Sequence, residues 1–161
     1  MSNLLADERT LLDEFVDSAR QEVADSLDGL SDEQARQRLV PSLTTPLGLV
    51  KHLTFVEQVW FEVALLGRAR AELGLPEDVD SSFAITDTDT VASVLGRYRE
   101  VCATSREIAA RYGLDDVAQH NRRSPMSLRW VYLHLIRELN RHAGHADILR
   151  EQLLAADGSE S

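Results

Sequence analysis

Residues 127–154 read SLRWVYLHLIRELNRHAGHADILREQLL, and their apolar side chains recur at the three- and four-residue steps of an α-helix. At about 100° per residue, one side of this helix would carry Val131, Leu135, Leu139, Ala146 and Leu149. The opposite side would carry Arg129, Asn140, Asp147, Arg150 and Glu151. The stretch therefore predicts a long amphipathic helix whose apolar side packs into a protein core.

Three earlier stretches show the same period, so the sequence predicts further helices. Together with the first stretch, they are expected over residues 4–27, 46–66, 89–113 and 127–154. Thr45 before Pro46 is a typical helix start, because threonine caps a helix and proline fits its first turn. Asp89 or Thr90 is expected to cap the third helix. Ser31 to Gln34 has the spacing of a capping box and predicts a short additional turn.

Long helices in this number predict an all-α four-helix bundle, a single domain over residues 1–161 in which residues 155–161 form a frayed tail. The segment from Arg68 to Thr88 has no helical period and contains many turn-forming residues. A connection of this length allows a crossover between helices, and long loops in compact domains are often functional. A second loop is expected over residues 115–125.

The composition excludes several classes of function. The chain has 161 residues with 17 basic and 27 acidic side chains, which gives a formal net charge of −10. Nucleic acids and anionic membranes need basic patches, so neither is an expected partner. No apolar run approaches the ~20 residues of a membrane span, and the first residues do not resemble a signal peptide. The single Cys102 can form no internal disulfide and is expected in the core of a cytoplasmic protein.

Four polar residues interrupt the apolar side of the last predicted helix: His134, Glu138, His142 and His145. Glu138 is the most unusual, because an isolated buried carboxylate costs several kcal/mol unless it is paired or neutralised. His52 likewise lies on the apolar side of the helix over residues 46–66, whereas Lys51, Thr54, Gln58 and Glu62 lie off it.

A divalent metal ion would compensate the Glu138 carboxylate. Glu138 and His142 are four residues apart and can converge on one point, which His52 can reach from a neighbouring helix. Two imidazoles and one carboxylate leave a coordination position open, as in catalytic rather than structural zinc sites. Zn²⁺ suits this ligand set best, and Ni²⁺, Mn²⁺ and Fe²⁺ also accept it. His134 and His145 are expected to support the ligands rather than bind the ion.

Simpler interpretations stay open at this point. Arg97 or Arg99 on the third helix could neutralise Glu138, and a core histidine is often purely structural. Trp60 and Trp130 are expected to be packing residues. The loop residues His120, Arg122 and Arg123 are most simply a solvated turn.

Several segments resemble the DinB/YfiT-like superfamily. They are Leu49–Leu53 (LVKHL), Ser127–Trp130 (SLRW) with His134 and Glu138, and Arg141–Asp147 (RHAGHAD). In particular they resemble its actinobacterial branch, which is related to the metal-binding domain of mycothiol-dependent maleylpyruvate isomerase. The resemblance implies a four-helix bundle with a crossover, and by position it implies His52, Glu138 and His142 as the metal ligands.

The resemblance also implies a metal-dependent thiol S-transferase, in which a low-molecular-weight thiol such as mycothiol attacks an electrophilic small molecule, for example in detoxification. The chain ends soon after the last helix and has no room for the isomerase's C-terminal domain, so we expect a transferase other than that isomerase. A metal-dependent hydrolase and a non-catalytic metal-binding stress protein are the alternatives. An Fe²⁺ oxygenase fits less well because its usual scaffold is a β-barrel. We expect a homodimer.

Overall fold

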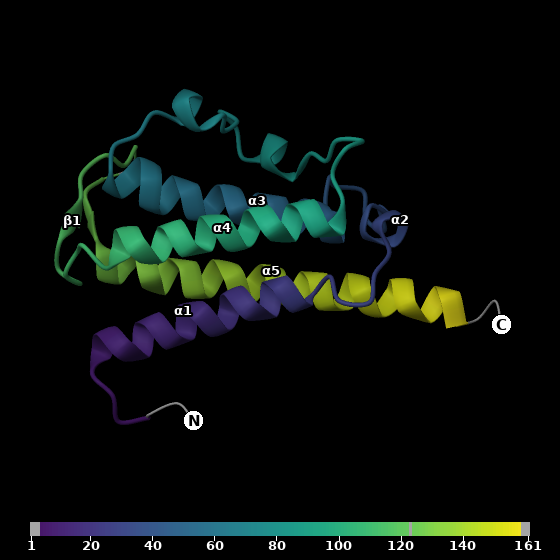
Figure 1. The fold of residues 1–161 in the computed structure, drawn as a ribbon, viewed down its shortest axis with the longest axis horizontal. Coiled ribbons are helices and arrows are strands. Elements are labelled where there is room, and N and C mark those ends of the chain that lie inside the picture. Colours follow the sequence, from purple (N-terminus) through teal and green to yellow (C-terminus); the bar gives the residue numbers. More distant parts are fainter. Residues whose placement is uncertain (1–3, 123, 159–161) are drawn as a thin grey trace.

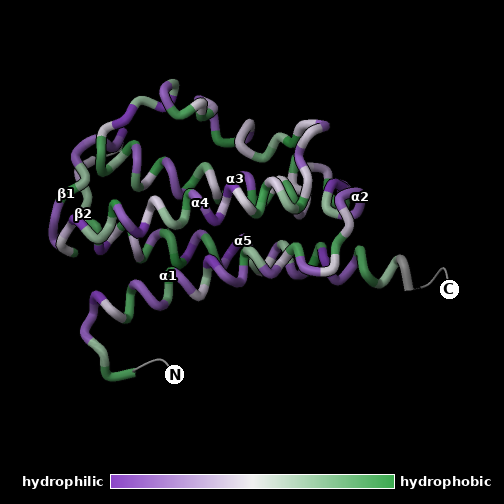
Figure 2. The backbone as a smooth tube through the Cα atoms, viewed as in Figure 1, coloured by the Kyte–Doolittle hydropathy of each residue, from purple (hydrophilic) through white to green (hydrophobic). Residues whose placement is uncertain are grey.

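The computed structural model describes residues 4–122 and 124–158, and its main helices form a bundle (Figure 1). These helices are α1 (Glu8–Asp25), α3 (Pro46–Gln58), α4 (Val91–Ala109) and α5 (Leu128–Gly158). Hydrophobic and hydrophilic residues alternate along them (Figure 2), as expected for helices with one side in a core. The predicted four-helix bundle is confirmed.

The helices run in an order that requires a crossover. α1 and α5 lie side by side and run in the same direction, while α3 and α4 run together in the opposite direction (Figure 1). Residues 66–90 lead back over α3 to the start of α4. The Lys51 ammonium, early in α3, pairs at 2.7 Å with Asp89 at the entrance to α4, so the two parallel helices begin at the same end.

Side chains at the helix starts explain where the helices begin. Thr45 and Thr90 cap α3 and α4 as predicted, and Ser31 forms the predicted capping box of the short helix α2 (Asp32–Ala35). The first helix starts later than the predicted residue 4, because the Asp7 side chain accepts a hydrogen bond from the Thr10 amide and caps α1.

The predicted helix over residues 46–66 is divided. α3 ends at Gln58 and the chain continues as a π-helix, η1 (Val59–Leu65). Gly67 then takes a φ of 75°, a left-handed conformation that stops the helix as predicted.

The two loops contain more structure than the sequence predicted. The crossover carries two short 3₁₀ helices, η2 (Arg70–Leu73) and η3 (Asp80–Phe83). In the second loop, β1 (Val117–Ala118) pairs antiparallel with β2 (Met126–Ser127). The fold is therefore mostly helical, with one short two-stranded antiparallel sheet at one end of the bundle.

The end of the chain departs from the predicted tail. α5 continues past Leu154 to Gly158, so residues 155–158 belong to the helix. The rest of the predicted tail, residues 159–161, lies outside the described residues. Among the described helices, none is both long and apolar enough to cross a bilayer.

Two predictions of side-chain burial are wrong. Phe15 shares the helical period of Leu12, Val16 and Ala19, which predicts a place on the buried side of α1, but it is 60% exposed. Thr54, Gln58 and Glu62 were expected to lie outside the core but are buried. The reason is that α4, α5 and the crossover each cover a side of the α3–η1 segment, so nearly its whole circumference is inside the protein.

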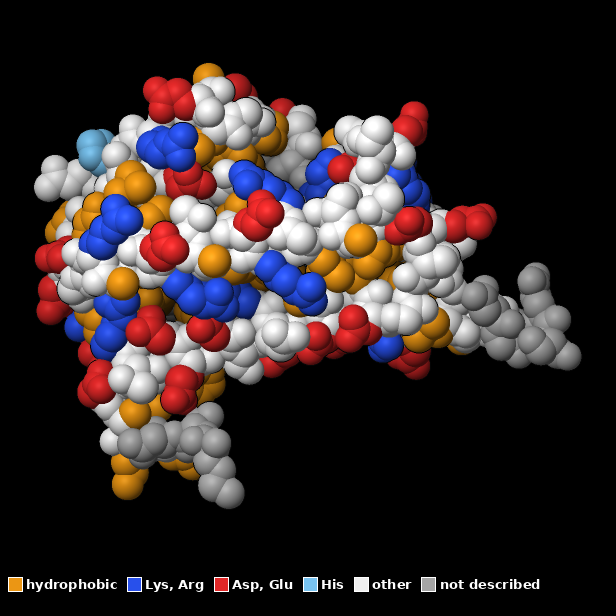
Figure 3. Space-filling view, in the orientation of Figure 1, with side chains coloured by type: hydrophobic (Ala, Val, Ile, Leu, Met, Phe, Trp, Pro, Cys, Tyr) orange, Lys and Arg blue, Asp and Glu red, His pale blue; other side chains and the backbone are white. Residues whose placement is uncertain are grey.

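Charged side chains of both signs are interspersed on the face of the molecule shown in Figure 3. Many of them form surface ion pairs, such as Arg106 with Asp17 at 2.9 Å. Such pairs contribute little stability individually, ~0 to 1 kcal/mol. On this face the basic side chains are interspersed with acidic ones, so this face has no continuous basic patch of the kind that binds nucleic acids.

Candidate metal centre

The structure brings His52, Glu138 and His142 together in the interior of the bundle. His52 comes from α3, and Glu138 and His142 come from successive turns of α5. One potential ligand atom from each residue lies within 4.8 Å of the other two. Both imidazoles are buried, whereas the Glu138 side chain is 20% exposed. The three residues selected from the sequence pattern therefore share one place and are consistent with a metal site.

Hydrogen bonds to the crossover fix the orientation and tautomer of His52. Its Nδ1 lies 2.7 Å from Ser82 Oγ, and the Ser82 hydroxyl donates its proton to the Val79 carbonyl at 2.5 Å. Ser82 must then accept from His52, so we assign the ring proton to Nδ1. The Phe83 ring stacks on a face of the His52 ring, with the ring centroids 4.0 Å apart. This arrangement leaves Nε2 with a free lone pair, the form that a metal ion requires.

Burial keeps both imidazoles neutral. Burial, with a smaller contribution from His142, lowers the pKa of His52 to about 3. Burial also lowers the pKa of His142, although the Glu138 carboxylate opposes that shift. At neutral pH both rings are therefore uncharged, and the neutral imidazole is the form that binds a metal ion.

The surroundings of His142 are consistent with a bound cation. Its Nε2 lies 3.7 Å from Glu138 Oε1, and its Nδ1 is buried without a hydrogen-bond partner among the described residues. Buried polar atoms nearly always have a partner, so this nitrogen needs an explanation. A cation held between His52, Glu138 and His142 would give a ring nitrogen of His142 such a partner and would balance the carboxylate.

The alternative partner for Glu138 is not found. Arg97 instead lies 3.5 Å from Glu100 on its own helix, and Arg99 lines a small cavity against α1. Within residues 4–122 and 124–158, Glu138 pairs with no lysine or arginine, and its contact at 3.7 Å is with the neutral ring of His142. Neutralisation by an arginine on α4 is therefore not what the structure shows.

His134 and His145 lie in different environments. His134 is half-buried, stacked on Trp130 with centroids 4.9 Å apart, and Trp60 contacts it edge-on at 4.8 Å. The prediction that His145 lies on the core side is wrong, since it is exposed with its ring centroid 5.5 Å from that of His142. The seven-residue step from Glu138 places His145 at the border of the buried side, where α5 faces solvent.

A cavity of about 300 Å³ adjoins the three residues, and we call it the site cavity. His52, Glu138 and His134 line it together with apolar residues of α3 and η1, including Phe55, Val59, Trp60 and Val63. Arg70, His120, Asn121 and Arg122 line it from the loops. Two of the loop residues expected to be a solvated turn, His120 and Arg122, therefore reach the site cavity, while Arg123 lies outside the described residues.

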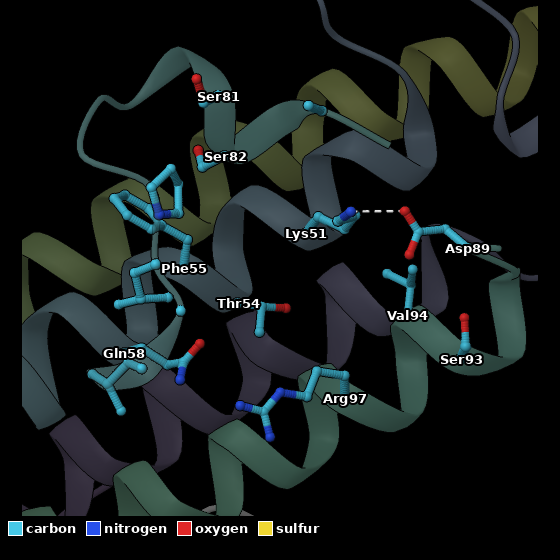
Figure 4. A pocket seen from close by; sticks show the side chains of 15 residues that line it. Lys51, Thr54, Phe55, Gln58, Ser81, Ser82, Asp89, Ser93, Val94 and Arg97 are labelled. Carbon is cyan, nitrogen blue, oxygen red and sulfur yellow. Dashed lines mark hydrogen bonds and ion pairs between the residues drawn. The ribbon is translucent and has the colours of Figure 1, made fainter. Parts of the chain in front are cut away.

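A second cavity of about 570 Å³ lies between α3, α4 and the crossover, and Figure 4 shows its lining. Thr54 and Gln58 on α3 and Arg97 on α4 line it, and the Lys51–Asp89 pair lies at its edge. Ser82 belongs to its wall, so this cavity and the metal centre meet at the residue that orients His52.

A buried ion pair that was not predicted from the sequence joins α1 to α3. Arg20 on α1 donates from Nε and Nη2 to the two oxygens of Glu57, at 2.8 and 2.7 Å. Arg20 is 5% exposed and Glu57 is 0% exposed. The burial of Arg20 could have been predicted from its spacing, because Arg20 follows the core residue Val16 by four positions and so shares its side of the helix.

Cys102 is buried as predicted, and burial raises the pKa of its thiol to about 12.

Comparison with known proteins identifies the family. The family model for mycothiol-S-transferase matches residues 11–155, which is most of the chain. No curated protein matches the chain. The match agrees with the resemblance seen in residues 49–53 and 141–147, and the helical bundle is consistent with the DinB/YfiT fold of that family. The chain belongs to the mycothiol-S-transferase family, a DinB/YfiT-like family of enzymes.

Proposed function

We propose that His52, Glu138 and His142 hold a divalent metal ion, and that this centre activates mycothiol for attack on an electrophile in the site cavity. The observation that carries the proposal is the convergence of these three side chains within 4.8 Å of one another, with His52 and Glu138 on the wall of the site cavity. When bound, the ion supplies positive charge that lowers the pKa of a thiol, so that the thiol reacts as its thiolate.

The residues of the chain have separate parts in this reaction. Ser82 holds the His52 ring with Nε2 available, and Glu138 contributes negative charge. The apolar side chains of Phe55, Val59 and Trp60 favour an electrophile with an apolar body and exclude water from it. With an alkyl halide, the thiol proton passes to solvent, a sulfur–carbon bond forms, and the halide leaves with the electron pair of the broken bond.

Zinc is the proposed ion, because two imidazoles and one carboxylate with an open position are typical of catalytic zinc. Ni²⁺, Mn²⁺ and Fe²⁺ are accepted by the same donors, and elemental analysis of the purified protein distinguishes them.

We also propose that the chain works in the cytoplasm as a homodimer. Homodimers are the commonest oligomers of soluble proteins, and light scattering of the purified protein tests this proposal.

The test combines metal analysis with a transfer assay, using mycothiol and monobromobimane. We expect roughly one metal ion per chain and thiol transfer in the unchanged protein. Glu138→Gln and His142→Gln should lose metal affinity by about 100-fold or more, since even residues that only orient metal ligands cost 10–100-fold. His145→Gln is the matched control, because it removes an exposed imidazole from the same helix and should leave both properties unchanged.

Two results would contradict the proposal. Metal retained at full stoichiometry in Glu138→Gln and His142→Gln would show that the ion lies elsewhere. Hydrolysis of electrophiles without thiol conjugation would show that water is the activated nucleophile.

A further inference from the structure

Arg70 stands out in the site cavity because its charge has no counterpart. It lies in η2 of the crossover and lines the same cavity as His52 and Glu138. Among the described residues, no carboxylate lies within ion-pair distance, 4.0 Å, of its guanidinium. Arginine is rarely buried without a partner, so a partly buried guanidinium that lines a cavity and pairs with no carboxylate is a candidate anion-binding group.

The guanidinium is nevertheless held in place. Its Nη1 donates to the carbonyl oxygens of Pro76 and Glu77, at 3.3 and 2.9 Å. Its Cζ lies 5.3 Å from the centroid of the Phe55 ring, which is a cation–π contact. Backbone acceptors and an aromatic face fix the position of Arg70 without neutralising it.

Two of its nitrogens have no hydrogen-bond partner among the described residues. Nη2 forms no hydrogen bond with any described residue, and Nε is buried and also without a partner. A planar guanidinium with two free nitrogens matches the two oxygens of a carboxylate. Arg122 differs, although it lines the same cavity, because it already pairs with Glu77 at 2.9 Å.

We propose that Arg70 binds a carboxylate on the electrophile, so that the preferred substrates have an apolar body and one anionic group. This rests on the proposed function. Glu138 and the reacting thiolate carry two negative charges, which match a divalent ion, and the Arg122–Glu77 pair is neutral. The charge of Arg70 is then left for the second reactant.

The first experiment measures binding of unreactive probes to the metal-loaded protein by calorimetry. The probes are 4-methylbenzoate and its uncharged analogue 4-methylbenzamide. Arg70→Gln should weaken benzoate binding by about 10- to 100-fold, the usual effect of losing a charged hydrogen bond, and should change amide binding by less than about twofold. Arg106→Gln, the control, removes a surface arginine that does not line the site cavity and should change benzoate binding by less than about threefold.

The second experiment measures transfer of mycothiol to 4-(bromomethyl)benzoate and 4-(bromomethyl)benzamide. Each reaction forms one sulfur–carbon bond and releases bromide, with the thiol proton passing to solvent. The ratio of the two kcat/KM values, corrected for the uncatalysed rates, should favour the acid in the unchanged protein. The ratio should fall by about 10- to 100-fold in Arg70→Gln and recover in part in Arg70→Lys.

The outcomes separate this inference from the proposed function. Benzoate affinity that survives in Arg70→Gln would overturn the inference, because the carboxylate would then bind elsewhere, for instance at the metal. An equal loss for acid and amide would also overturn it and assign Arg70 a structural role in the crossover. Arg70-dependent benzoate binding without any thiol transfer would support the anion site and contradict the proposed function instead.

Discussion

At the scale of single residues, His52 shows how the fold prepares a ligand. A histidine in a core is usually neutral and structural, and burial is the main cause of the lowered pKa of His52. The hydrogen bond to Ser82 holds the proton on Nδ1 and so leaves Nε2 as the nitrogen that can accept a metal ion. A side chain from α3 is thus oriented by the crossover to meet side chains from α5.

The low pKa of His52 predicts an acid sensitivity of the metal-free protein. In the unfolded chain His52 takes up a proton near its ordinary pKa of 6.5, but in the folded protein it does so only at about 3. Acid therefore favours the unfolded state, and stability is lost as pH falls from 6.5 toward 3. Between about pH 7 and about pH 4.5 we expect His52 to reduce the free energy of unfolding by about 2–3 kcal/mol.

Urea unfolding of the metal-free protein at both pH values measures this contribution. His52→Gln is the control, since glutamine keeps a hydrogen-bonding amide but does not titrate. The loss of stability on acidification should be smaller in His52→Gln by that amount. An identical pH dependence of the two proteins would show that burial does not hold His52 neutral.

At the scale of elements, the helices were predictable where local chemistry decides them. The caps at Thr45 and Thr90 were predictable because each threonine precedes a periodic stretch. The helix end at Gly67 was predictable because glycine readily takes the left-handed conformation that it has here. The pairing of Glu138 with His142 follows from their four-residue step. These features depend on residues that are close in sequence, so a single amino-acid sequence is enough to predict them.

Features set by tertiary contacts could not be predicted in this way. Ser82 gains its role only because η3 lies against α3, and no spacing rule connects residues 52 and 82. The π-helix η1 has an ordinary helical sequence, yet its residues Val59, Trp60 and Val63 line the site cavity. π-Helical turns are often found at functional sites, and here η1 forms part of the wall of the site cavity.

The ion pair between α1 and α3 predicts a large asymmetry between single and double variants. Arg20→Met should lower the free energy of unfolding by about 3–5 kcal/mol, because it leaves the Glu57 carboxylate buried and unpaired. The double variant Arg20→Met with Glu57→Leu should recover much of that loss, since it removes both charges. Chemical denaturation of the single and double variants measures the coupling. A cost below about 1 kcal/mol for Arg20→Met would mean that Glu57 finds water or another partner.

At the scale of the whole molecule, the crossover makes the site. It provides Ser82 and Phe83 to His52, and it provides Arg70 to the site cavity. An up-down-up-down bundle with short loops would lack all of these side chains. The helices supply the three proposed ligands, and the segment that returns over α3 orients one of them and supplies the free charge beside the cavity (Figure 1).

Because the proposed ligands come from α3 and α5, metal binding should tie these helices together and stabilise the whole fold. An ion that binds only the folded state, at about 100 times its Kd, adds about 2.7 kcal/mol. For a chain of 161 residues this corresponds to a rise in Tm of about 5–10 °C. Thermal unfolding of the metal-free protein with and without zinc measures the rise. Glu138→Gln should lose it while His145→Gln keeps it, and an equal rise in both variants would place the stabilising ion away from His52, Glu138 and His142.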